Sequence, residues 1–121
     1  MGLENIWVTT LNDGLVRADH IVGIESHQTP ELPGKRPRWL LDVTLAVSVG
    51  SGTREGWEVM QLHRTLIQTD SYPDKAAENL ARTFDDLRRQ GVSGVVRVGT
   101  RHDFVRFEFF PFDSNDNTDD Y

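Results

Sequence analysis

The sequence predicts an α+β domain: an antiparallel sheet of about five to six strands, covered on one face by a single long helix. Residues 73–90 space their apolar side chains as an amphipathic helix does, whereas the stretches before and after them alternate or cluster apolar residues as strands do. The elements follow the order ββββ-α-ββ. Strands grouped on either side of one helix are typical of the α+β class.

The first elements predict a β-hairpin. Residues 6–10 alternate as a strand does, the Asn-Asp-Gly at residues 12–14 tolerates positive φ, and residues 15–18 resume a strand. A further apolar run, residues 21–24, either extends the second strand past a bend at residues 19–20 or forms a separate short strand.

The middle of the chain predicts a loop followed by two strands. Residues 25–38 contain three prolines, which remove backbone donors and disfavour both helix and central strand. Residues 39–49 are rich in Leu and Val and predict a strand buried on much of both faces, and residues 50–56 predict a glycine-rich turn. Residues 57–68 fit neither template cleanly. We expect a strand paired with residues 39–49, and a helix is the alternative.

The helix over residues 73–90 has start and stop signals at both ends. Ser71 and Asp74 have capping-box-like spacing, Pro73 suits the first turn, and Gly91 can end the helix. Its apolar residues form one stripe that is expected to face the sheet: Ala76, Ala77, Leu80, Ala81, Phe84 and Leu87.

A second hairpin follows the helix. Residues 95–98 and 104–109 predict its strands, in which Val105, Phe107 and Phe109 share one face. Residues 113–121 are too polar to pack and predict a disordered acidic tail, which leaves residues 1–112 as one domain. One helix covers only one face of a sheet and leaves the other face uncovered. Because the chain is rich in aromatic residues, we expect a second copy of the chain or a protein partner to cover that face.

Composition excludes several classes of site and location. The chain has no cysteine, which excludes disulfides, thiolate metal sites and a cysteine nucleophile. No apolar run reaches the roughly 20 residues that span a bilayer, and the first residues lack a signal peptide's basic region, so we expect a cytoplasmic protein without membrane contact. The net charge of -6 comes largely from four tail aspartates. The rest of the chain carries 15 acidic against 13 basic residues, which disfavours binding to duplex nucleic acid.

One glycine run has the appearance of a dinucleotide-binding loop. Gly50, Gly52 and Gly56 follow an apolar strand, and Asp70 lies further along. The gap between the second and third glycine is one residue too long, and the following segment is too short for the helix such a site requires. We therefore predict a hairpin connection here and no cofactor.

The histidines suggest a possible acid/base site but no metal site. None of the four has the i, i+4 spacing of metal ligands. His20 follows an aspartate and His102 precedes Asp103, both near strand ends that a fold could bring together. The competing interpretation is that each is an ordinary surface imidazole.

The only dense basic cluster is Lys35, Arg36 and Arg38, in the proline-rich loop beside Trp39. It could bind phosphate or an acidic partner. The alternative is a loop kept soluble by charge.

Residues 8–25 resemble the start of small FlbD-like bacterial β proteins, which open with a strand, a glycine turn, a second strand and an Asp-x-Ile step. The resemblance implies a β-hairpin at the start of the domain. The flagellar regulation associated with that family is not carried over, because the helix and the C-terminal hairpin lie outside the resemblance.

Catalytic signatures such as nucleophile elbows, Walker loops and zinc motifs are absent from the sequence. The prediction for function is a non-catalytic interaction or oligomerisation module. A small enzyme using His20, His102 and Asp103 is the first alternative, and a phosphate-ligand domain using Lys35, Arg36 and Arg38 is the second.

Overall fold

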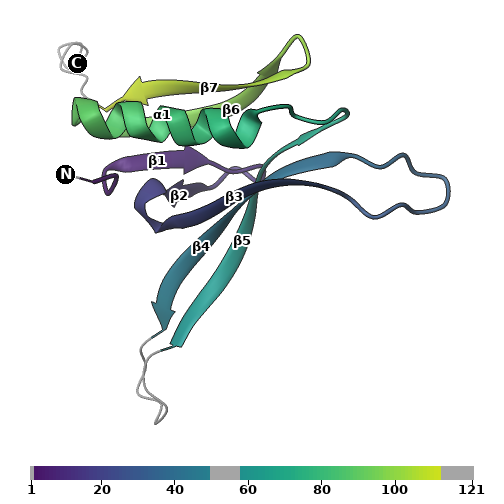
Figure 1. Cartoon of the computed structure of the whole chain (residues 1–121), viewed down its shortest axis with the longest axis horizontal. Coiled ribbons are helices and arrows are strands. Elements are labelled where there is room, and N and C mark those ends of the chain that lie inside the picture. Colours follow the sequence, from purple (N-terminus) through teal and green to yellow (C-terminus); the bar gives the residue numbers. More distant parts are fainter. Residues whose placement is uncertain (1, 50–57, 113–121) are drawn as a thin grey trace, which may run out of the picture.

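The computed structural model describes residues 2–49 and 58–112, and it confirms the α+β class (Figure 1). Five strands precede the helix, rather than the four expected. A short 3-10 turn, Ala18–His20, separates the second and third strands. The elements are β1 (Ile6–Thr9), β2 (Leu15–Arg17), β3 (Ile21–Gln28), β4 (Trp39–Val49), β5 (Glu58–Thr69), α1 (Ala76–Gln90), β6 (Gly94–Arg101) and β7 (Phe104–Pro111).

The strands form two sheets, which differs from the single antiparallel sheet that was predicted. One sheet has four strands in the order β2-β1-β6-β7, and the other has three in the order β3-β4-β5. All neighbouring strands are antiparallel except β1 and β6, which pair in parallel with Val8 opposite Val96. Parallel neighbours require a long crossover connection, and everything between β1 and β6, including α1, supplies it.

The split into two sheets occurs at the turn after β2. Arg17 and Asp19 form a two-pronged ion pair across this turn, with both N to O distances 2.8 Å, and Ala18 between them is buried. The chain therefore leaves the first sheet at the bend expected near residues 19–20. Of the two alternatives for residues 21–24, the separate strand is correct, and it is longer than predicted.

The core lies between the two sheets and α1. The four-stranded sheet contributes Ile6, Val8 and Val96, and the three-stranded sheet contributes Leu41 and Val43, all at most 1% exposed. The helix adds its predicted stripe, of which Ala76, Leu80, Phe84 and Leu87 are buried, Ala77 is half-buried and Ala81 is exposed.

The helix begins later than predicted, at residue 76 instead of 73. Its N-cap is Lys75, which has a left-handed backbone (φ 60°) and makes no side-chain capping bond, so the capping box expected from Ser71 and Asp74 does not form. The predicted end is confirmed. Gly91 has φ 67°, and its N–H donates to the carbonyls of Leu87 (3.0 Å) and Arg88 (3.3 Å), an arrangement that favours glycine.

The described part of the ambiguous segment, residues 58–68, belongs to strand β5, which pairs with β4 as expected. A register shift interrupts this ladder at Leu41 and Asp42. The two strands form a long hairpin that projects away from the helix in Figure 1. The predicted glycine turn, residues 50–56, and the predicted tail, residues 113–121, lie outside the described residues. Within the part that is described, no helix has the length and apolar character required to cross a bilayer.

Candidate functional site

One of the two outer strands of the four-stranded sheet, β7, has an open edge. It pairs with β6 on one side, and among the described residues no strand pairs with its other side, which lies at the top of Figure 1. Such an edge presents a row of backbone N–H and C=O groups to any strand that approaches. The edge is eight residues long, and four of these residues are phenylalanines.

Side chains of β7 alternate between two faces, as the sequence predicts. Val105, Phe107 and Phe109 are half-buried against the core. Arg106 and Glu108 are on the opposite, exposed face, together with Phe104, which is 67% exposed. The exposed face therefore combines two opposite charges with aromatic surface.

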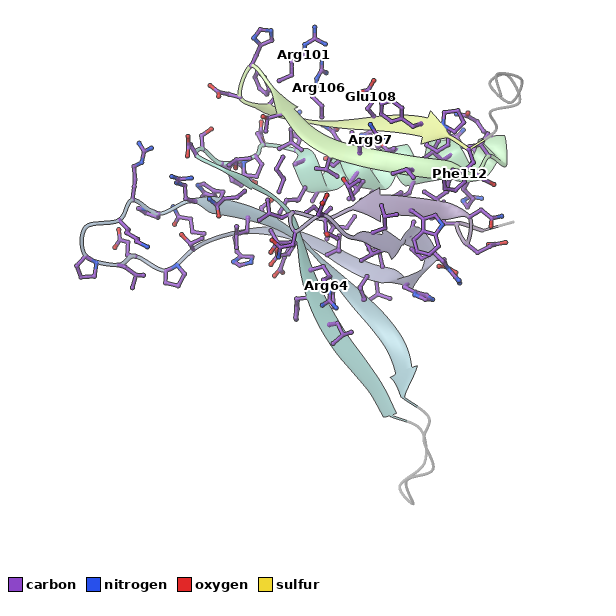
Figure 2. All side chains as sticks on the ribbon, turned by 180° about the vertical axis from the view of Figure 1, so that it is seen from behind. Arg64, Arg97, Arg101, Arg106, Glu108 and Phe112 are labelled. Atoms are coloured by element: carbon purple, nitrogen blue, oxygen red, sulfur yellow. The ribbon has the colours of Figure 1, made fainter. Side chains whose placement is uncertain are left out.

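The neighbouring strand β6 adds arginines to this outer face. Arg97 lies opposite Glu108 in the ladder, and its guanidinium carbon is 4.3 Å from the ring centre of Phe110, a cation–π contact. Arg101 lies opposite Phe104. Figure 2 shows these arginines along the hairpin, away from Arg64 on the three-stranded sheet.

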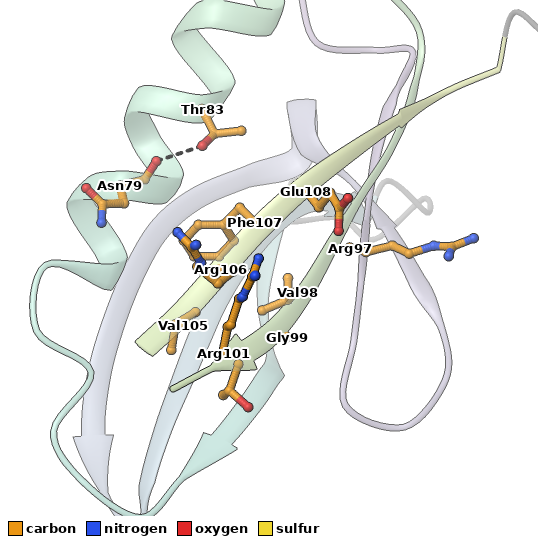
Figure 3. A pocket seen from close by; sticks show the side chains of 11 residues that line it. Asn79, Thr83, Arg97, Val98, Gly99, Arg101, Val105, Arg106, Phe107 and Glu108 are labelled. Carbon is orange, nitrogen blue, oxygen red and sulfur yellow. Dashed lines mark hydrogen bonds between the residues drawn. The ribbon is translucent and has the colours of Figure 1, made fainter. Parts of the chain in front are cut away.

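A hollow of about 600 Å³ adjoins β7 on the side of the helix. Both faces of the β6–β7 hairpin contribute to its lining, together with α1 (Figure 3). The lining includes Asn79 and Thr83 of α1, the inward residues Val105 and Phe107, and the outer-face residues Arg97, Arg101, Arg106 and Glu108. The Thr83 hydroxyl donates to the carbonyl oxygen of Asn79 (2.9 Å), so this hydroxyl is already engaged by the helix. The hollow leaves space beside the β7 edge.

A second hollow, of about 540 Å³, lies at the proline-rich loop, and it brings together the predicted basic residues. Lys35, Arg36 and Arg38 line it, together with Thr29 and Gln68. Among these cations Arg38 has an acidic neighbour, since its Nε is 3.3 Å from a carboxylate oxygen of Asp70. Sequence reasoning thus identified a cluster that the fold places around one concave surface.

The predicted acid/base residues are at opposite edges of the four-stranded sheet. His20 is in the 3-10 turn after β2, where its Nε2 is 3.9 Å from an oxygen of Asp19. His102 and Asp103 form the turn between β6 and β7, both with positive φ (53° and 69°). Because β2 and β7 are the two outer strands, the structure does not bring His20 to His102. Among the described residues, no group of histidine, aspartate and glutamate side chains could hold a metal ion.

The structure instead assembles a polar network that sequence reasoning missed. Nε2 of His27 on β3 is 2.6 Å from Oδ2 of Asp42 on β4, and the Thr65 hydroxyl on β5 donates to Oδ1 of Asp42 (2.7 Å). Asp42 is 7% exposed, whereas the His27 side chain is 44% exposed. The one available signal was Asp42 itself, a charged residue within an apolar strand, since a buried carboxylate needs hydrogen-bond partners.

This network fastens three strands together and does not form a catalytic triad. A carboxylate only accepts hydrogen bonds, so Nε2 of His27 carries the proton that it shares with Asp42. The Thr65 hydroxyl points at the same carboxylate and is not positioned to be activated by the imidazole. The network serves to give each carboxylate oxygen of the buried Asp42 a hydrogen-bond donor, one from β3 and one from β5.

The network predicts a pH-dependent contribution to stability. The hydrogen bond from His27 to Asp42 raises the pKa of His27 above its usual value, against a smaller opposing effect of burial. A raised folded-state pKa stabilises the protein fully below the unfolded-state pKa of about 6.5, and this contribution is lost as the pH rises through the folded-state pKa. Because the imidazole is nearly half exposed, the contribution is expected to be no more than about 1 kcal/mol.

Urea unfolding at about pH 5.5 and about pH 8.5 tests this expectation in the wild type and in Asp42→Asn. The variant is expected to lose the extra stability of the wild type at the lower pH. Thr65→Val is the matched control, because it removes the second hydrogen bond of Asp42 and leaves the His27 pair intact. It should lower stability at both pH values and keep their difference; equal pH dependence in the wild type and Asp42→Asn would refute the assignment.

Comparison with known proteins yields no relative. No protein-family model matches the chain, and no curated protein and no solved structure matches it significantly. The resemblance of residues 8–25 to FlbD-like proteins therefore contributes no function.

Proposed function

We propose that the protein is a non-catalytic oligomerisation module that forms a homodimer by antiparallel pairing of the β7 edges of two copies. The observation that carries this proposal is the open, aromatic, eight-residue edge of β7. Two-fold symmetric dimers are the commonest oligomers, and an antiparallel strand pair satisfies the backbone groups of both edges. The cytoplasmic location expected from composition belongs to this proposal.

The sequence of β7 is complementary to itself in one register. A two-fold axis at Phe107 sets Arg106 opposite the partner's Glu108, and Glu108 opposite the partner's Arg106. The same register sets Phe104 opposite the partner's Phe110 on the outer face. Opposite charges and aromatic pairs directly across an antiparallel ladder each contribute about 0.2–1 kcal/mol, so these pairs favour this register over its neighbours.

The hollow beside α1 provides room for the inner face of such a dimer. In the proposed register Val105 lies opposite the partner's Phe109, and Phe107 lies opposite the partner's Phe107. The space bounded by Asn79 and Thr83 adjoins Phe107 of β7, so the approaching strand does not have to displace the helix.

The other edges are less suited to this pairing. β2 has three residues. The ladders of β3 and β5 with β4 both contain register shifts, whereas β7 pairs with β6 without one. Irregularities of this kind re-aim an edge strand and hinder edge-to-edge pairing.

The test is molar mass in solution by light scattering behind gel filtration. The wild type is expected at twice the chain mass of 13.8 kDa. Arg106→Glu sets glutamate opposite the partner's Glu108, and Glu108→Arg sets arginine opposite the partner's Arg106. Each single substitution turns two attractive pairs into two repulsive ones and should raise the dimer Kd by about 10- to 100-fold.

The double variant Arg106→Glu/Glu108→Arg restores opposite charges across the pair and should restore the dimer. Arg64→Glu is the control, since it makes the same charge change on an exposed residue of β5. A wild type that is monomeric at every concentration would refute the dimer. A dimer that is insensitive to the single substitutions would refute the β7 interface.

The other functions considered from the sequence differ in their support. The small-enzyme alternative lacks an assembled cluster, because His20 and His102 are on opposite edges of one sheet. The phosphate-ligand alternative is favoured by a specific observation, the concave surface lined by Lys35, Arg36 and Arg38.

A further inference from the structure

The loop that carries the basic residues is a preformed arm. At its base the Thr29 N–H donates to the Arg38 carbonyl (2.8 Å), and the Arg38 N–H donates to the Thr29 hydroxyl (2.9 Å). At its tip Pro33 and Gly34 occupy the centre of a turn closed by a bond from the Lys35 N–H to the Leu32 carbonyl (3.0 Å). Gly34 has φ 78°, which suits the third position of a type II turn after proline.

This arm fixes the backbone that presents three cations. Lys35 follows the turn directly, and Arg36 and Arg38 lie on the leg that returns to β4. Because the base and the tip are both hydrogen-bonded, a ligand does not have to order the backbone of the loop, and little conformational entropy is lost on binding.

The hollow at the arm is positively charged. Its described lining contains Lys35, Arg36 and Arg38 and no carboxylate. Asp70 contacts Arg38 through Nε, at 3.3 Å, which leaves the two terminal nitrogens of that guanidinium for another acceptor. The Gln68 amide adds a neutral group with two donors at the wall.

We infer that this hollow binds a ligand that carries linked phosphate groups. Arginine guanidinium groups match phosphate oxygens in a two-pronged geometry, and lysine acts as a point charge. Three cations around a space of about 540 Å³ exceed the needs of one phosphate and suit a chain of two or three. The chemistry is shared by inorganic tripolyphosphate and by a nucleoside triphosphate, and Pro30 and Leu32 supply an apolar wall that a base could contact.

Titration calorimetry with sodium tripolyphosphate tests the inference, at about 0.1 M and about 0.5 M salt. The wild type is expected to bind at the lower salt and to weaken at the higher one, because exposed charges are screened. The triple variant Lys35→Ala/Arg36→Ala/Arg38→Ala should raise the Kd by at least about tenfold.

Two further variants sharpen the result. Arg64→Ala/Arg82→Ala/Arg89→Ala removes the same amount of charge from exposed positions on β5 and α1 and should leave the Kd within about threefold of the wild type. Asp70→Asn frees Arg38 from its carboxylate and should tighten binding by about threefold. If both triple variants raise the Kd equally, tripolyphosphate is attracted to the positive charge of the whole protein, and the proposed site is wrong. The site is also wrong if the wild type does not bind tripolyphosphate.

Adenosine triphosphate and adenosine distinguish the two sources of phosphate. If adenosine triphosphate binds more tightly than tripolyphosphate, the base contacts the apolar wall of Pro30 and Leu32. If the two bind equally, the site recognises the phosphate chain alone. Binding of adenosine triphosphate with unchanged affinity in the Lys35→Ala/Arg36→Ala/Arg38→Ala variant would overturn the inference. The hollow is lined by residues other than those of β7, so failure of the dimer in light scattering leaves this test unaffected.

Discussion

Replacing Gly94 by alanine is expected to destabilise the protein by about 2–3 kcal/mol. A Cβ at this position would collide with the carbonyl oxygen of Phe110 and would lie 2.7 Å from the nearest ring carbon of Phe109. The ring has little room to retreat because it packs against the core, and the carbonyl belongs to the backbone of the neighbouring strand β7. The added methyl group therefore forces β6 and β7 apart where β6 begins.

Urea unfolding followed by tryptophan fluorescence measures this effect. Gly99→Ala is the matched control in the same strand, because a Cβ there has no heavy atom within 4 Å. It should change the free energy of unfolding by less than about 0.5 kcal/mol. If the two variants are equally stable, the close approach of β7 to Gly94 is wrong.

Replacing Leu80 by alanine is expected to cost about 3–4 kcal/mol, because it empties the centre of the core. Leu80 is 0% exposed and belongs to the buried stripe of α1 that closes the space between the two sheets. The loss combines the transfer energy of the side chain with the cavity that remains, since strands on either side cannot fully collapse into the gap.

Leu15→Ala is the control for Leu80→Ala. It makes the same chemical change on β2 at a side chain that is 51% exposed, and it should cost less than about 1 kcal/mol. Both variants are compared with the wild type at one protein concentration, because dimer formation would make stability concentration-dependent. Equal losses in the two variants would contradict the position of α1 over the core.

The elements were predictable from the sequence, and their assembly was not. The helix stripe and the alternation in β7 depend on local periodicity, which the chain displays directly. The two-sheet arrangement depends on the turn at Ala18–His20 and on the pairing of β1 with β6, which are distant in the sequence. Local patterns carry no information on such long-range partners. The late start of the helix was also unpredictable, because nothing in the sequence indicates that Lys75 adopts a left-handed backbone.

The candidate sites also divide into one that could be predicted from the sequence and two that depend on how the strands assemble. Lys35, Arg36 and Arg38 were predictable as a group because they occupy one short loop. The role of β7 as an edge required the strand order, and the bond from His27 to Asp42 required the register of β3 on β4.

The parallel pairing of β1 with β6 has a consequence for the order of events during synthesis. The three-stranded sheet consists of consecutive hairpins and can form as the ribosome releases them, whereas β1 must wait for β6 before the four-stranded sheet closes. β7 joins only after β6, so the strand that we propose as the dimer contact is the last to enter the fold. In a chain that emerges from its N-terminus, the edge that we propose as the dimer contact would thus form only after the other described strands have been released.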